Sequence, residues 1–92
     1  MEKQLSIGTV VLSKSGRDKG RYFIVCSIID ADYILIADGD LRKLARPKKK
    51  KAKHVTVTFD QLENIAKKLQ NNLKVFDSEV KSALRVYNEK QN

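Results

Sequence analysis

Two apolar runs separated by a short charged loop restrict the start of the chain to a β-hairpin. The first run spans about Leu5 to Leu12, and the second, Tyr22 to Ile29, is almost continuously apolar, which is typical of buried strands. Gly16 and Gly20 lie at either side of the loop tip. Because glycine adopts positive φ angles without steric cost, the loop can turn sharply and expose backbone N–H groups.

The hairpin also carries a recognisable pattern, which reads Gly8-x-Val10-Val11-x-Ser13-x-x-Gly16-Arg17-Asp18-x-Gly20-Arg21. This pattern resembles the KOW motif, a strand–loop–strand unit of small SH3-like barrels in ribosomal proteins and transcription elongation factors. The similarity continues through Ile28–Gly39, which resembles archaeal and eukaryotic large-subunit ribosomal proteins of the fourteen-e type and stand-alone bacterial KOW-domain proteins. The resemblance covers about the first half of the chain and implies a barrel that binds RNA.

Three further strands are predicted beyond the hairpin. Tyr33–Ala37 is apolar and ends at Asp38-Gly39, a strong turn signal. Leu41–Ala45 is expected as a short fourth strand that ends before Pro47, because proline cannot donate a ladder hydrogen bond. His54–Thr58 regains β character, and as a fifth strand pairing with the first it would close a small barrel. The lysines between Pro47 and this strand are expected to form an extended, self-repelling loop.

From Phe59 the apolar period changes from two to 3.6 residues, which predicts two amphipathic helices. The apolar faces comprise Leu62, Ile65, Ala66 and Leu69 in the first helix and Val80, Ala83, Leu84 and Tyr87 in the second. Each helix is about three turns long and unstable alone in water, so both should pack on each other, on the barrel or on a partner.

The ends of both helices carry capping signals. Thr58 with Gln61 and Asp60 with Glu63 are alternative capping boxes for the first helix, which is expected to end at Asn71-Asn72. Asp77 or Ser78 is expected to be the N-cap of the second helix. The predicted fold is therefore a five-stranded SH3-like β-barrel over residues 1–58, with a basic loop at 46–53, followed by a C-terminal helical hairpin over 59–92.

Positive charge is concentrated in one segment of the chain. The net charge is +8, and residues 42–53 contain eight lysines and arginines and no acid. The rest of the chain is balanced, with eleven residues of each sign. Ordinary solvated faces mix both signs, so a localised excess indicates an acidic partner such as nucleic acid.

The candidate RNA-binding residues come from the hairpin loop and from this basic segment. They are Ser13, Lys14, Ser15, Gly16, Arg17, Lys19, Gly20 and Arg21 in the loop, and Arg42, Lys43, Arg46, Lys48, Lys49, Lys50, Lys51 and Lys53 in the segment. Lysines act as flexible point charges that supply affinity rather than base identity. Asp18 is expected to fix the loop by accepting backbone or arginine hydrogen bonds. If both groups lie at the same end of the barrel, they can straddle a groove.

Few aromatic residues are present, which argues against stacking platforms for single-stranded bases. Phe23, Phe59 and Phe76 are expected in the core or as staple residues, and Tyr22 as a half-buried structural residue. This composition favours recognition of shape and backbone in folded RNA.

Catalytic, metal and cofactor chemistry has no support in the sequence. Cys26 and His54 are single residues of their kind on separate strands, so they make a poor nucleophile–base pair and no metal site. Cys26 is expected as a small buried hydrophobe and His54 as a rim residue. No phosphate-cradling GxxxxGK[ST] motif is present. We expect a non-enzyme without cofactors, and a cytoplasmic location because no apolar run is long enough for a membrane span.

The predicted function is binding of structured RNA through its backbone phosphates, with ribosomal RNA as the favoured target. Two alternatives stay open: a protein-interaction module of the transcription or translation machinery, and duplex DNA binding. The C-terminal helices are also candidates for docking a ribosomal or transcription protein.

Overall fold

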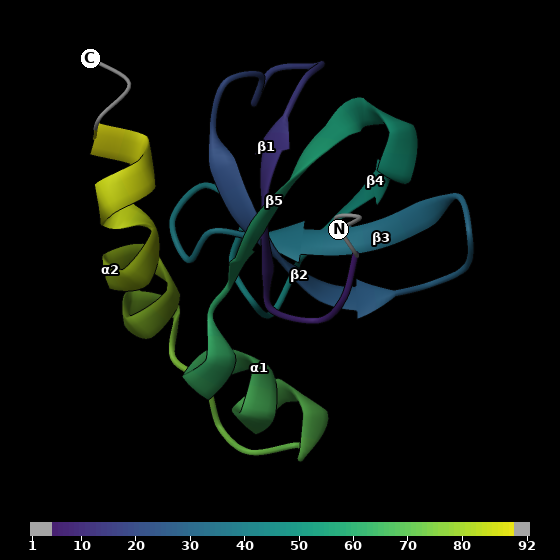
Figure 1. Ribbon diagram of the computed structural model, residues 1–92. Helices are drawn as coiled ribbons and strands as arrows, with labels where there is room; N and C mark the ends of the chain where they lie inside the picture. Colours follow the sequence, from purple (N-terminus) through teal and green to yellow (C-terminus); the bar gives the residue numbers. More distant parts are fainter. Residues whose placement is uncertain (1–4, 90–92) are drawn as a thin grey trace.

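The computed structural model describes residues 5–89, which form a five-stranded antiparallel sheet followed by two helices (Figure 1). The strands are β1 (Thr9–Ser13), β2 (Tyr22–Ile28), β3 (Tyr33–Ala37), β4 (Lys48–Lys51) and β5 (Val55–Gln61). A short 3₁₀ helix, η1 (Ala52–His54), joins β4 to β5, and the helices are α1 (Glu63–Gln70) and α2 (Asp77–Asn88). The strand order is β4-β3-β2-β1-β5. The predicted return of the last strand to the first is therefore confirmed.

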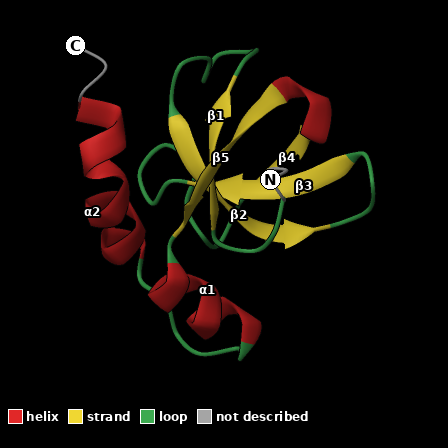
Figure 2. Ribbon diagram, in the orientation of Figure 1, coloured by secondary structure: helices red, strands yellow, loops and turns green. Residues whose placement is uncertain are grey.

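The predicted closed barrel is not formed. β5 pairs with β1 from Gln61 opposite Thr9 to Val55 opposite Ser13, but no ladder joins β5 to β4 within residues 5–89. The sheet is strongly twisted, with β4 and β5 as its two edges (Figure 2). η1 connects the edge strand β4 to the other edge strand, β5.

The first strand is shorter than the predicted Leu5–Leu12. Residues 7–8 form a turn instead, in which Gly8 has a φ of 85° and donates its N–H to the Val25 carbonyl over 2.8 Å. A Cβ at this position would lie 2.5 Å from the Cβ of Ala66 in α1. Glycine is therefore required here by both the backbone angle and the close approach of the helix.

The predicted fourth strand at Leu41–Ala45 is wrong, because the strand is Lys48–Lys51, the run expected to be an extended loop. Asp38 holds the chain after β3 in a turn, where its Oδ1 accepts the Arg42 N–H over 2.8 Å. Backbone hydrogen bonds to β3 do not depend on side-chain charge, so lysines can pair once their charges are accommodated. Because side chains alternate between the two sides of a strand, Lys50 is buried while Lys49 and Lys51 are exposed to solvent.

The sheet is buried on both faces where β1 and β2 lie. One cluster contains Val11, Phe23, Val25, Ile34, Ile36 and Val55, and the other contains Val10, Ile24, Ile65, Val80 and Leu84. Neighbouring residues of β2 therefore enter opposite clusters. This explains why the run from Tyr22 is almost continuously apolar rather than alternating.

Both helices pack their predicted apolar faces against the second cluster, so these faces serve the fold. α1 ends at Asn71 as expected, but neither predicted capping box starts it: its N-cap is Leu62, with no side-chain hydrogen bond. The reason is that β5 continues to Gln61, and the Thr58 hydroxyl donates to the Val10 carbonyl over 2.7 Å. The expected division after residue 58 thus falls inside β5.

The N-cap of α2 is Phe76 rather than Asp77 or Ser78. Glu79 accepts the Phe76 N–H over 3.2 Å, and Asp77 instead accepts the Leu44 N–H over 2.7 Å. The Asp77 carboxylate therefore anchors the loop between β3 and β4 to α2.

The phenylalanines divide between interior and surface. Phe23 is fully buried as predicted, whereas Phe59 and Phe76 are 69% and 56% exposed, so a core position is wrong for these two. No helix among residues 5–89 has the length and apolar character needed to cross a bilayer.

Candidate nucleic-acid interface

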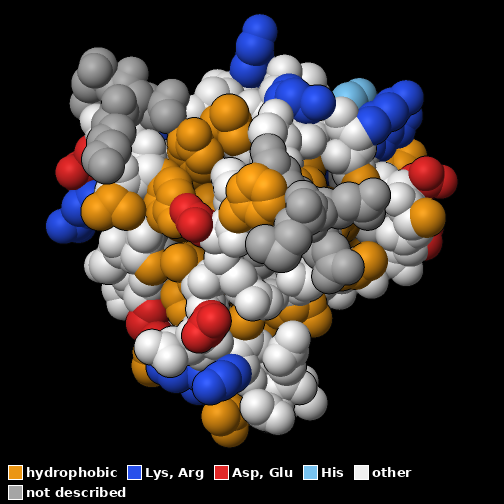
Figure 3. Space-filling view, in the orientation of Figure 1, with side chains coloured by type: hydrophobic (Ala, Val, Ile, Leu, Met, Phe, Trp, Pro, Cys, Tyr) orange, Lys and Arg blue, Asp and Glu red, His pale blue; other side chains and the backbone are white. Residues whose placement is uncertain are grey.

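The hairpin loop, β4 and η1 meet on one side of the molecule. Lys50 Nζ donates to the Ser15 carbonyl over 2.7 Å, and the Lys14 N–H donates to the His54 carbonyl over 2.8 Å. The three segments carry six exposed cations: Lys14, Arg17, Lys19, Lys49, Lys51 and Lys53. We call them the basic face. Figure 3 shows lysine and arginine side chains gathered along the upper edge of the molecule, beside the histidine.

The loop turns as its glycines predict, with φ angles of 83° at Gly16 and 90° at Gly20. Its backbone donors are less available than expected, because the N–H groups of Lys19, Gly20 and Arg21 all donate to carbonyls between residues 13 and 18. The side chains at the tip, rather than these N–H groups, are therefore the groups offered to a ligand.

Asp18 is the internal anchor of the loop and is only 3% exposed. Its Oδ1 accepts hydrogen bonds from Ser13 Oγ over 3.1 Å and from Lys50 Nζ over 3.3 Å, and its Oδ2 lies 3.5 Å from Lys48 Nζ. Burial raises the pKa of Asp18, but the hydrogen bond and charge of Lys50 and the charge of Lys48 outweigh it and lower the pKa below 3.8. The expected anchoring role is correct, although serine and lysines are the donors.

This anchor removes two predicted site residues from the surface. Ser13 is 1% exposed and Lys50 is 5% exposed, and both side chains are used by the buried Asp18 cluster. Lys48 is partly exposed but also paired with Asp18. These three residues hold the loop against β4, and the side chains of Ser13 and Lys50 are too deeply buried to contact a ligand.

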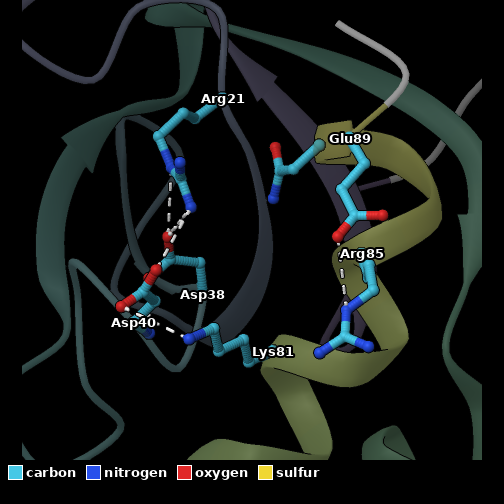
Figure 4. Close-up of a pocket in the computed structure, with 7 residues that line it drawn as sticks. Arg21, Asp38, Asp40, Lys81, Arg85 and Glu89 are labelled. Carbon is cyan, nitrogen blue, oxygen red and sulfur yellow. Dashed lines mark hydrogen bonds and ion pairs between the residues drawn. The ribbon is translucent and has the colours of Figure 1, made fainter. Parts of the chain in front are cut away.

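Arg21 forms an intramolecular ion pair with Asp38 and is not part of the basic face. Its guanidinium donates to Asp38 Oδ2 from Nη2 over 3.0 Å and from Nε over 3.3 Å. Figure 4 shows this pair in a pocket of about 220 Å³ between the hairpin and α2, which also contains ion pairs of Lys81 with Asp40 and of Arg85 with Glu89. Cations and carboxylates balance there, so the pocket offers no net charge to a polyanion.

The remaining predicted cations lie in the loop that leads into β4. Lys43 and Arg46 are exposed and Arg42 is half-buried. This loop is fixed to α2 through the Leu44 backbone, and its three cations form no hydrogen bond or ion pair with the basic face in the described part of the chain. The structure thus unites the hairpin loop with Lys48–Lys53, but leaves 42–46 as a separate group.

Tyr33 is a surface residue that sequence reasoning did not select. It pairs with Lys51 across β3 and β4, and Lys49 Nζ lies 4.5 Å from the centroid of its ring. Only the register of β4 places an aromatic ring among these lysines. The lysine run itself carried no signal that it was a strand.

His54 reports the electrostatic environment of the basic face. Its pKa is lowered from 6.5, first by partial desolvation and then by the charges of neighbouring lysines, of which Lys53 and Lys51 contribute most. Positive charge is therefore crowded enough here to disfavour one more proton. Its half-buried position beside the lysines agrees with the expected rim location.

The Cys26 thiol is poorly suited to nucleophilic chemistry. Burial and the nearby Asp77 carboxylate raise the pKa of Cys26 to about 12, so the nucleophilic thiolate is scarce at neutral pH. Within residues 5–89, no group of three or more His, Cys, Asp or Glu side chains can hold a metal ion.

No protein-family model matches this chain, and no curated protein matches it. The charge of the basic face and the resemblance of the hairpin to the KOW motif are therefore the features that bear on function.

Proposed function

We propose that this protein is a non-catalytic, KOW-type SH3-like module that binds structured RNA, with ribosomal RNA as its target, through backbone phosphates. One observation carries the proposal: three chain segments that meet through the Lys50–Ser15 and Lys14–His54 hydrogen bonds carry six exposed cations, and none of these forms an ion pair with another residue between 5 and 89. The buried Asp18 cluster holds the hairpin loop against β4, so the backbone segments that carry these charges stay together.

Phosphate contact is favoured over base reading because five of the six cations are lysines. Lysine ammonium groups are point charges that fit phosphates without distinguishing bases. Folded RNA is recognised mostly by shape and backbone, which a cluster of such charges can contact. The resemblance of the hairpin to RNA-binding KOW proteins favours RNA over duplex DNA.

A role as a protein-interaction module has less support. A groove for proline-rich peptides needs clustered aromatic residues, and among residues 5–89 the basic face has only Tyr33 beside it. The predicted apolar faces of α1 and α2 are packed against the sheet. A ribosomal or transcription protein docking on these helices would have to use their outer surfaces, where Val86 is 59% exposed.

Fluorescence anisotropy with a labelled ribosomal RNA hairpin, read between 50 and 200 mM salt, tests the proposal. Six phosphate contacts give a slope of log K against log salt of about −4 to −5, and roughly a 10³-fold loss over this range. Competition by duplex DNA at one fixed salt concentration separates the DNA alternative. A slope near zero, or preference for DNA, would contradict the proposal.

Crosslinking in cells identifies the target, and ribosomal RNA should dominate the sequenced fragments. Recovery of a polymerase or another protein without RNA would favour the interaction-module alternative. A ribosomal target implies a cytoplasmic location.

RNA binding is expected to raise the pKa of His54. Neighbouring lysine charges lower this pKa in the free protein, and phosphates close to those lysines would offset the charges and favour the protonated ring. Affinity should accordingly increase as pH falls toward and below 6.5. The chain has a single histidine, so imidazole NMR signals report it without ambiguity. An unchanged pKa with RNA bound would mean that RNA lies elsewhere.

A further inference from the structure

A pocket of about 280 Å³ opens next to the basic face. Its lining residues are Ala31, Asp32, Tyr33, Lys51, Ala52 and Lys53. Two contacts build it: Tyr33 lies opposite Lys51 in the β3–β4 register, and the Ala52 N–H donates to the Asp32 carbonyl over 2.8 Å. The turn between β2 and β3 is thereby held beside η1.

The lining combines the three chemical groups that a nucleotide needs. Tyr33 supplies an aromatic ring, already approached by Lys49 Nζ at 4.5 Å from its centroid. Lys51 and Lys53 are exposed cations suited to a phosphate. Asp32 is the acidic member of the lining and forms no ion pair with either lysine. A carboxylate accepts hydrogen bonds from ribose hydroxyls or base amino groups and repels phosphate.

We propose that this pocket takes one unpaired nucleotide of the bound RNA, with its base against Tyr33 and its phosphate at Lys51 and Lys53. The inference rests on the proposed function, because RNA supplies the nucleotide. Unpaired bases of folded RNA are commonly splayed out and stacked on aromatic side chains. The volume is close to the lower limit of about 300 Å³ for small-molecule pockets, which suits one nucleotide and not a run of bases.

Two RNA hairpins that differ only by one bulged nucleotide test the inference by fluorescence anisotropy. The protein should bind the bulged hairpin about tenfold more tightly, a factor within the range for stacking of one base on an aromatic ring. Tyr33→Leu should reduce the affinity for the bulged hairpin to that for the paired one, while Tyr33→Phe retains the preference. Phe76→Leu is the matched control, since Phe76 is an exposed ring outside the pocket that, like the half-buried Tyr33, has a lysine near its centroid, here Lys74 at 5.4 Å.

A second variant keeps the test valid if Tyr33→Leu does not fold. Ala52→Met fills the same pocket from η1 and should also remove the preference for the bulge. Retention of the preference in folded Tyr33→Leu or Ala52→Met protein would overturn the inference.

The two hairpins also separate this inference from the proposed function. Failure to bind either hairpin contradicts the proposed function itself, whereas equal binding of both overturns only the pocket assignment. Free AMP and GMP form a third arm, read from the Tyr33 ring signals by NMR. If these mononucleotides bind the pocket more tightly than the bulged hairpin does, its ligand is a free nucleotide and the RNA-borne assignment is wrong.

Discussion

Replacing Arg17, Lys51 and Lys53 together by glutamine is expected to lower the affinity for structured RNA about 100- to 500-fold at 0.1 M salt. Each phosphate contact contributes about 0.7–0.9 to the slope of log K against log salt. The slope should therefore become shallower by about 2–3. The three residues come from the hairpin loop, β4 and η1, so the variant removes charge from every part of the basic face. Binding measured across a salt series gives both quantities.

The matched control replaces Lys67, Lys74 and Lys81, three exposed lysines outside the basic face, by glutamine. Both variants lose three positive charges, so non-specific attraction falls equally. Equal losses of affinity in the two variants would mean that net charge, and not the basic face, governs binding. Lys48 and Lys50 are left intact, because they pair with Asp18 and their loss would disturb the loop.

Asp18→Ala is expected to destabilise the protein by about 3–5 kcal/mol, the usual result of removing one partner of a buried ion pair. Lys50 is 5% exposed and would keep its charge without a counterion. Ser13 would lose the carboxylate that its hydroxyl now reaches over 3.1 Å. Urea denaturation of the two proteins gives the difference in the free energy of unfolding.

Two further variants define this effect. Asp40→Ala removes a more exposed carboxylate whose ion pairs are both 3.9 Å long, and should change stability by about 0.5 kcal/mol or less. Lys50→Met should lower the free energy of unfolding less than Asp18→Ala does, because Asp18 keeps its ion pair with Lys48 and its hydrogen bond from Ser13. Similar stabilities of Asp18→Ala and Asp40→Ala would exclude the anchoring role.

The pH dependence of stability offers an independent reading of Asp18. Its pKa is lowered on folding, so its contribution is fully present above the unfolded value near 3.8. The contribution is lost as pH falls through the lower folded value. Asp18→Ala lacks this contribution, so its free energy of unfolding should fall less steeply in acid than that of the wild type.

Local patterns were sufficient for much of the fold. The predicted strands Tyr22–Ile29 and Tyr33–Ala37 and the helical faces of α1 and α2 depend on periodicity within a few residues. Each was found, with the first strand ending one residue earlier, at Ile28. Helix starts were predicted less well, because Thr58 has a competing tertiary partner in the Val10 carbonyl. A capping signal is local, but whether the chain uses it depends on where the preceding strand ends.

In the candidate site, the sequence identified the basic segments but not which of their charged side chains are exposed. Sequence counting treated all lysines of residues 48–53 alike. Alternation in β4, however, buries Lys50 against Asp18 and turns Lys49 and Lys51 outward. Arg21 was predicted to bind RNA with the loop, but its guanidinium is paired with the carboxylate of Asp38, seventeen residues away. Ion pairs between residues so far apart in the chain produce no periodic pattern in the sequence.

By itself, the sequence determined the hairpin with its glycine-bounded loop, the amphipathic helices and the localised charge excess, because each is a property of neighbouring residues. Only the tertiary structure decided that the lysine run is an edge strand, that Asp18 anchors it, and that Tyr33 stands among the outward lysines. Those features arise from the register between β3 and β4 and from the burial of one carboxylate. Both are set by long-range pairing, which composition and spacing do not encode.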